Sequence, residues 1–280
     1  MICLSSAVFN KEENTRRVLG LFWQNCKTPW EQVAEPLQLA PHVYYVGSTW
    51  VGATVIDTGD GLIMIDAGMP LQLYTIFESM RTIGLDPKQI KLLLISHGHF
   101  DHVGAAKAVL EYTGAKLYCG REDLEAIAGR DPESLRNHDE PYTGVTPDGF
   151  FSDDEPITLG NITIHTKLTA GHTPGTTSFF FQDKDESGRI FNLGLHGGMG
   201  LNTMQNNEEA PAKRKIYREN MEMLRTLPID ITCSNHPAMA HLYERAEQNK
   251  GAEYPFYDPT VWPNMIDHFL ALLDSLEAQG

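Results

Sequence analysis

The chain has 280 residues, of which 22 are basic and 37 acidic, so its formal net charge is −15. Hydrophobic residues make up 41% and charged residues 21%, which is typical of a folded globular protein rather than a disordered one. The acidic balance disfavours nucleic acid and anionic membranes as partners, because both bind basic surfaces.

The sequence contains no membrane-spanning segment, since no stretch approaches the roughly 20 apolar residues that such a helix needs. The N-terminal residues 1–17 include charged side chains and no continuous apolar run, so no signal peptide is predicted. We therefore expect a cytoplasmic protein. A trimmed N-terminus would change this expectation to a periplasmic or secreted one.

Residues 1–40 carry few regular signals and are predicted to form an N-terminal extension packed on the domain, with residues 41–280 forming that domain. Three short β-rich runs then predict an antiparallel meander, because glycines separate them: Val43–Val46, Ala53–Ile56 and Leu62–Ile65. Farther along, the predicted helices are Pro70–Gly84, Val103–Tyr112, Arg121–Ala128, Glu208–Thr226, Ala240–Asn249 and Val261–Ala278. The predicted strands are Lys91–Ser96, Lys116–Cys119, Ile162–Leu168, Thr176–Gln182, Arg189–Leu193 and Asp230–Cys233. This order indicates a single α/β domain of two sheets with helices outside, and a long loop at His138–Asp154.

The four cysteines are widely spaced and form neither a zinc-finger pattern nor a dense disulfide scaffold. Cys119 and Cys233 are predicted to be small buried side chains. Pairing of Cys3 with Cys26 stays open.

The strongest chemical signal is Ser96-His97-Gly98-His99-Phe100-Asp101-His102, which directly follows a predicted buried strand. Alternate residues of an extended turn face the same way, so His97 and His99 can share one cation, while Asp101 and His102 can face a second. Imidazoles at this density suit zinc or iron, and a carboxylate suits a second metal.

His97-x-His99-x-Asp101-His102 resembles the signature of the metallo-β-lactamase superfamily. Three further segments resemble that superfamily in the same order along the chain. They are the strand that ends in Asp66-Ala67-Gly68, the turn Gly171-His172-Thr173-Pro174-Gly175, and Ser234-Asn235-His236-Pro237.

The resemblance implies a four-layer αββα sandwich with two metal ions at one edge of the sheets. His97, His99 and His172 would bind the first ion, and Asp101, His102 and His236 the second. Asp66 would accept a hydrogen bond from a ligand imidazole. The ligand set lacks cysteine and is most similar to the third subclass of class B β-lactamases. It implies two Zn²⁺ ions per chain, with iron or manganese as alternatives.

The implied function is a zinc-dependent hydrolase of a small molecule, which attacks with a metal-bound hydroxide and opens a β-lactam amide ring. Asp101 would be the catalytic carboxylate that orients the hydroxide or protonates the leaving group. The alternatives are hydrolysis of a lactone, ester, thioester or phosphodiester. A metal-binding protein without turnover is disfavoured, because all six ligands are present.

The segment Gly194-Leu195-His196-Gly197-Gly198 departs from the superfamily pattern. A metal-bridging aspartate is absent there, which disfavours glyoxalase-II-type and lactonase-type sites. The two serines of the third subclass are also absent, with Leu195 and Gly197 in their places. His196 could face the metals, bind a substrate anion or cap the strand, and these three roles stay open.

Overall fold

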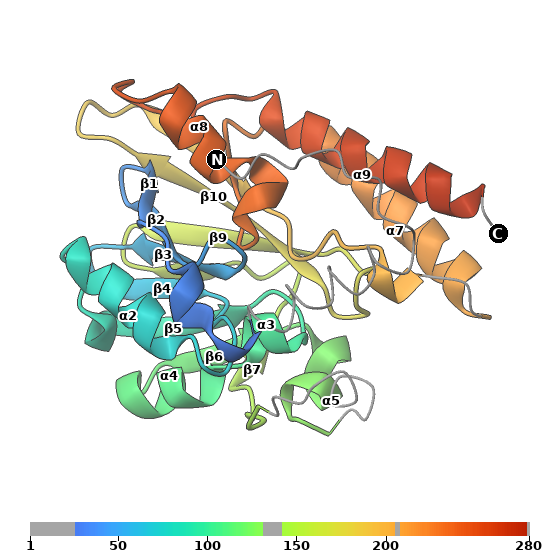
Figure 1. The fold of residues 1–280 in the computed structure, drawn as a ribbon, viewed down its shortest axis with the longest axis horizontal. Coiled ribbons are helices and arrows are strands. Elements are labelled where there is room, and N and C mark those ends of the chain that lie inside the picture. Colours follow the sequence, from blue (N-terminus) through green and yellow to red (C-terminus); the bar gives the residue numbers. More distant parts are fainter. Residues whose placement is uncertain (1–25, 131–141, 205–207, 279–280) are drawn as a thin grey trace.

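The computed structural model describes residues 26–130, 142–204 and 208–278, and these residues form two sheets that lie between two sets of helices (Figure 1). The first sheet has the strand order β1-β2-β3-β4-β5-β6-β7, and the second has the order β12-β11-β10-β9-β8. The strands of the first sheet are β1 (Leu37–Ala40), β2 (Val43–Gly47), β3 (Gly52–Asp57), β4 (Leu62–Ile65), β5 (Ile90–Ile95), β6 (Lys116–Cys119) and β7 (Gly149–Phe150). Those of the second are β8 (Ile157–Leu159), β9 (Ile162–Leu168), β10 (Thr177–Lys184), β11 (Ile190–Leu195) and β12 (Ile231–Cys233).

Alternate residues of strand β4 show why the domain has layers. Ile63 and Ile65 belong to the core between the two sheets, whereas Leu62 and Met64 belong to a second core on the opposite face. Helices α2 and α4 cover that opposite face, and α7 and α9 pack on the outer face of the second sheet (Figure 1). The α-helices are α2 (Leu73–Thr82), α3 (Phe100–Val103), α4 (Ala106–Thr113), α5 (Leu124–Ile127), α7 (Ala210–Arg225), α8 (Leu242–Gln248) and α9 (Val261–Glu277). The predicted αββα sandwich is therefore confirmed.

The first sheet changes from antiparallel to parallel at β4, and this change positions the functional residues. Strands β2, β3 and β4 form the predicted antiparallel meander. Strands β4, β5, β6 and β7 then pair in parallel, so their carboxyl ends lie at one edge of the sheet. Loops that follow parallel strands at such an edge commonly form binding sites.

Three short strands were not predicted from the sequence: β1, β7 and β8. Strand β1 pairs with β2, which brings Leu37 opposite Tyr45, so residues 37–40 are part of the first sheet. Residues 1–25 of the expected N-terminal extension lie outside the described residues, as does Cys3. Cys119 and Cys233 are buried, as predicted.

The helix predicted over Val103–Tyr112 is wrong at its start, because the structure has two helices, α3 and α4, separated by Gly104 and Ala105. A Cβ atom at position 104 would lie 2.3 Å from the carbonyl oxygen of Phe100 and 2.4 Å from Cδ of Pro70. The absence of a side chain therefore lets α3 approach the turn at Pro70 closely.

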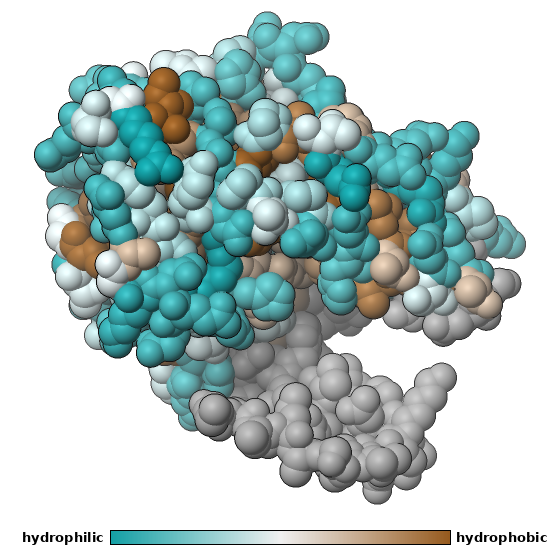
Figure 2. All heavy atoms as spheres, turned by 90° about the horizontal axis from the view of Figure 1, so that it is seen from above, coloured by the Kyte–Doolittle hydropathy of each residue, from teal (hydrophilic) through white to brown (hydrophobic). Residues whose placement is uncertain are grey.

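None of the described helices is both long and apolar enough to span a membrane. The face seen in Figure 2 is covered mainly by hydrophilic residues, and its hydrophobic residues form separate small groups. Scattered exposed apolar residues of this kind are ordinary on a folded domain.

Candidate metal centre

The residues of the predicted motif lie at the carboxyl end of β5, which is buried over its last three residues. The chain is still extended at His99, with φ −75° and ψ 150°, and then turns into α3. Asp101 and His102 therefore lie on the first turn of a helix, whereas His97 and His99 precede it. This change of direction divides the motif into two parts.

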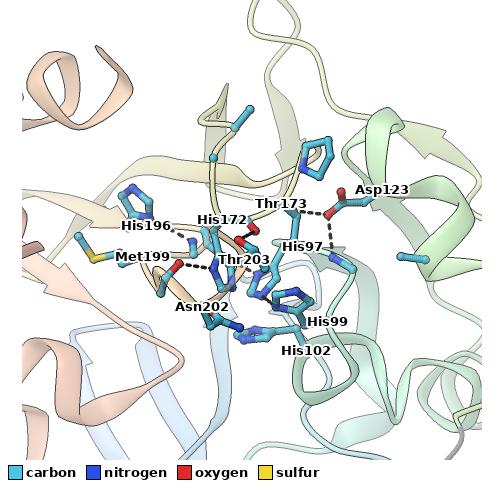
Figure 3. Close-up of a pocket in the computed structure, with 18 of the residues that line it drawn as sticks. His97, His99, His102, Asp123, His172, Thr173, His196, Met199, Asn202 and Thr203 are labelled. Atoms are coloured by element: carbon cyan, nitrogen blue, oxygen red, sulfur yellow. Dashed lines mark hydrogen bonds between the residues drawn. The ribbon is translucent and has the colours of Figure 1, made fainter. Parts of the chain in front are cut away.

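His97, His99 and His172 form the first of two clusters of potential metal ligands, and we call it the three-histidine group. One potential ligand atom from each residue lies within 4.8 Å of the others. His172 comes from the turn between β9 and β10 of the second sheet, while the other two follow β5 of the first. Nε2 of His97 lies 3.1 Å from Nδ1 of His99, and the three rings converge in Figure 3.

Asp101, His102 and His236 form the second cluster, which we call the mixed group, and their ligand atoms also lie within 4.8 Å of one another. His236 follows β12 of the second sheet. Its Nε2 atom lies 3.2 Å from Nε2 of His102 and 3.3 Å from Oδ2 of Asp101. The structure thus brings together all six residues that the sequence singled out as ligands, in the two predicted sets.

Hydrogen bonds fix which ring nitrogen of the histidines carries the proton. Nδ1 of His97 donates to the carbonyl oxygen of Gly197 at 2.7 Å. Nδ1 of His172 donates to Gly200 at 2.6 Å, and Nδ1 of His236 to Trp50 at 2.9 Å. Because a carbonyl oxygen only accepts, the Nε2 atom of each neutral ring carries a lone pair that is available to a cation.

The charges of the mixed group also favour a cation. Burial alone would raise the pKa of Asp101, but His102 and His236 lower it below its ordinary value, so the carboxylate is ionised. Burial alone would lower the pKa of His102, but the carboxylates of Asp66 and Asp101 outweigh it and raise that pKa. Two Nε2 atoms 3.2 Å apart beside an ionised carboxylate form a site that attracts a cation.

The three-histidine group differs, because the rings of His97 and His172 are held neutral. Burial and the neighbouring imidazoles, first that of His102, lower the pKa of His97 well below its ordinary value. Burial and His99 lower the pKa of His172 in the same way. Neutral imidazoles are the form that binds metal ions.

Asp66 connects the mixed group to the first sheet. It is fully buried and has a positive φ of 65°, which is rare for a residue other than glycine. Its carboxylate accepts hydrogen bonds from Nδ1 of His102 at 2.6 Å and from Nδ2 of Asn235 at 2.8 Å. The main-chain N–H and the hydroxyl of Ser96 donate to it as well, at 2.7 and 2.8 Å. Asp66 therefore holds the imidazole of His102, one of the proposed ligands, through a direct hydrogen bond.

Two further residues at the site were missed in the sequence. Asn235 donates to Asp66 and accepts from the hydroxyl of Thr54 at 2.7 Å, and thereby fixes the segment that carries His236. Asp123, at the start of α5, is buried and contacts the loops of the three-histidine group (Figure 3). Asp123 follows β6, the neighbouring parallel strand, and this position could have indicated it.

His196 lies apart from the histidine cluster (Figure 3). Its Nδ1 accepts a hydrogen bond from the main-chain N–H of Gly198 at 3.1 Å, so the proton of the neutral ring is on Nε2. That Nε2 atom is buried and has no hydrogen-bond partner within the described part of the chain. Burial lowers the pKa of His196 to about 3, which keeps the ring uncharged.

Both groups line a cleft of about 1410 Å³. Lys213 is the one lysine or arginine among the described residues that line it, and its ammonium group lies 2.8 Å from the carboxylate of Glu209. The remaining charged lining residues outside the two groups are acidic: Asp66, Glu122, Asp123, Glu125 and Glu208. The cleft therefore offers no unpaired lysine or arginine from the described residues to a substrate anion.

The family model described as "Metallo-beta-lactamase superfamily" matches residues 51–186. Taken with the fold and the two ligand groups, this match places the chain in the metallo-β-lactamase superfamily, as a metallo-hydrolase. The solved structures that resemble it include BJP-1, a subclass B3 metallo-β-lactamase of Bradyrhizobium japonicum, with a TM-score of 0.81 and 27% identity. That match covers 90% of this chain and 96% of BJP-1. The FEZ-1 metallo-β-lactamase of Legionella gormanii is similar with a TM-score of 0.79 and 28% identity, over 88% of this chain and 98% of FEZ-1.

Two curated relatives have names that do not mention β-lactams. The probable metallo-hydrolase YqgX of Bacillus subtilis is 25% identical over 210 residues, which are 73% of this chain and 93% of YqgX. The hydroxyacylglutathione hydrolase GloC of Haemophilus influenzae is 30% identical over 97 residues, which are 34% of this chain and 46% of GloC. The predicted resemblance is confirmed, including the similarity to the third subclass, whereas the substrate is a separate question.

Proposed function

We propose that the chain is a binuclear, zinc-dependent hydrolase that opens the amide ring of a β-lactam. The observation that carries this proposal is the pair of three-ligand clusters, which lie side by side in one cleft and are built from both sheets. Similarity to subclass B3 enzymes over about nine-tenths of the chain supports the substrate class.

The three-histidine group would hold one zinc ion and the mixed group the other, which makes two ions per chain. Neutral imidazoles with one carboxylate suit zinc, and they also accept iron or manganese. When bound, such ions lower the pKa of a coordinated water to about 7 and polarise the bond that is attacked.

The protein's own contribution is to orient the reacting groups and to move a proton. Oδ2 of Asp101 lies 3.3 Å from Nε2 of His236 and 3.8 Å from Nε2 of His102, so its position is set by two residues of the mixed group. Asp101 would accept the proton of the attacking water and pass it to the leaving nitrogen. An ionised carboxylate is the form that this role requires.

A second candidate is hydrolysis of a lactone, ester or thioester. The observation that favours it is the pairing of Lys213 with Glu209 at 2.8 Å, which leaves a β-lactam carboxylate without a lysine or arginine partner among the described lining residues. The relative GloC is named as a hydroxyacylglutathione hydrolase, which gives this candidate separate support.

The test is hydrolysis of a chromogenic cephalosporin by zinc-reconstituted protein. A γ-lactone and an S-acyl glutathione are assayed in parallel. Asp101→Asn serves as the catalytic variant and Asp60→Asn, at an exposed turn, as its matched control. We expect cephalosporin turnover that falls by about 100-fold or more in Asp101→Asn and is unchanged in Asp60→Asn. Absence of cephalosporin turnover in a protein with two bound zinc ions, together with hydrolysis of the lactone or thioester, would establish the second candidate.

A further inference from the structure

Asp123 is a buried carboxylate that contacts both loops of the three-histidine group. Its Oδ2 atom accepts a hydrogen bond at 2.8 Å from the main-chain N–H of Gly98, the residue between His97 and His99. The same atom accepts from the hydroxyl of Thr173, next to His172, at 2.6 Å. Oδ1 accepts from the N–H of Gly175 at 2.7 Å. One side chain thus connects segments that lie 25 and about 50 residues away in the sequence.

Three glycines allow these segments to approach Asp123 closely. A Cβ atom at Gly120 would lie 2.1 Å from the carbonyl oxygen of Gly175, and one at Gly175 would lie 2.6 Å from Cγ of Asp123. A Cβ atom at Gly98 would lie 2.7 Å from Cβ of Ala126. A side chain at any of the three positions would push the loops apart, so the glycines and the carboxylate act together.

The electrostatic environment of Asp123 indicates a role beyond packing. Only 4% of the residue is exposed, and none of the described lysines or arginines forms an ion pair with it. A buried carboxylate without a cation is costly, and its cost is offset here by three hydrogen bonds that all come from the two histidine-bearing loops. None of these bonds reaches Asp101, His102 or His236.

We propose that Asp123 is a positioning residue that holds the two loops of the three-histidine group at the spacing required to bind a metal ion. Asp66 contacts His102 of the mixed group, so each ligand group has its own supporting carboxylate. This inference rests on the proposed metal site but does not depend on the proposed substrate.

The experiment is a zinc titration of the metal-free protein against a chromophoric chelator, which gives two dissociation constants. The ¹H–¹⁵N signals of the histidine rings show which group is occupied. The variants are Asp123→Asn, which keeps the size but replaces an accepting oxygen by a donor, and the pair Thr173→Val and Thr173→Ser. Asp66→Asn provides the comparison for the mixed group.

We expect Asp123→Asn to weaken zinc binding at the three-histidine group by about 10- to 100-fold, with a change of less than about threefold at the mixed group. Thr173→Val should weaken the same group, and Thr173→Ser, which keeps the hydroxyl, should restore its affinity. Asp66→Asn should act mainly on the mixed group.

An equal loss at both groups in Asp123→Asn, or a lower melting temperature with both dissociation constants unchanged, would overturn the inference and leave Asp123 a purely structural residue. If the unaltered protein bound no zinc at its histidines, both the proposed function and this inference would fail. Tight binding by the unaltered protein with no effect of any Asp123 or Thr173 variant would remove this inference alone.

Discussion

His196 lies outside the two ligand groups, and its ring carries a buried hydrogen-bond donor. Its Nε2–H is inaccessible to solvent and has no partner in the described residues, although the ring lines the cleft. A buried donor without a partner costs about 1–3 kcal/mol, and a substrate oxygen that reaches it after a small rotation of the ring toward the cleft would recover part of that cost. Because burial lowers the pKa of His196 to about 3, the ring acts as a neutral donor and not as a cation.

We therefore predict that His196→Ala raises KM by about 3- to 10-fold, the value of one neutral hydrogen bond, with zinc content unchanged. KM and kcat are measured on the substrate identified by the assays above, and zinc by elemental analysis. The contribution of His196 should be constant from pH 5 to 8, since the ring stays deprotonated above its lowered pKa. Loss of zinc in His196→Ala would instead assign the residue to the metal site.

The residues of the site differ in how readily the sequence alone indicates them. The six proposed ligands could be singled out because they occur in compact motifs, and the motif after β5 combines four of them within six positions. Asp123 was not predictable in this way, because it stands in an ordinary helix start and its partners are distant in the chain. Its role depends on how the loops pack, and a local pattern does not contain that information.

Helix α9 packs on the domain through four buried side chains, of which Trp262 is the largest. Trp262 is fully buried, and its Nε1 atom donates to the carbonyl oxygen of Leu224 in α7 at 2.8 Å. A Cβ atom at Gly194 of β11 would lie 3.1 Å from the Trp262 ring, so the indole is enclosed from the sheet side as well. By contrast, Arg225 and Asp267 form a two-point ion pair between α7 and α9 that is about half exposed.

We predict that Trp262→Ala lowers the free energy of unfolding by about 3–5 kcal/mol, through lost burial and the cavity left behind. Arg225→Ala should cost less than about 1 kcal/mol, because the pair is exposed and screened by solvent. Urea unfolding of the metal-free variants measures both changes. A larger cost for Arg225→Ala than for Trp262→Ala would contradict the view that burial dominates this interface.

The elements were predictable to different degrees. Regular patterns of five or more residues, such as β5, β9, α7 and α9, were recognised with ends close to those observed. Strands β7 and β8 have two and three residues, too few for an alternating pattern, and they form because neighbouring strands offer hydrogen-bond partners. At the division between α3 and α4, the N–H of Ala105 donates to the carbonyl oxygen of Gly68, which lies 37 positions earlier in the sequence and cannot be inferred from helical periodicity.

At the scale of the whole molecule, both ligand groups combine residues from the two sheets. His97, His99, Asp101 and His102 follow β5 of the first sheet, whereas His172 and His236 come from the second. A bound ion in either group would therefore join the two halves of the sandwich. This arrangement predicts that metal affinity and global stability are linked.

Removal of zinc should lower the melting temperature of the protein, and its return should restore it. At a free zinc concentration of 100 times the dissociation constant, one site that binds only the folded state adds about 2.7 kcal/mol. Calorimetry with and without a chelator, over a series of zinc concentrations, measures the effect. His236→Ala, which removes one proposed ligand of the mixed group, should show a smaller zinc-dependent shift, and an equal shift would place the stabilising ion elsewhere.

The separation of the ligands along the chain also has a kinetic consequence. His102 and His236 are 134 residues apart, so their ring nitrogens meet only after the second sheet has docked on the first. Contacts of such long range form late, because a large loop must close before they yield any energy. Zinc should therefore leave the refolding rate nearly unchanged and slow unfolding instead. The bound metal would then increase the kinetic stability of a domain that has already assembled.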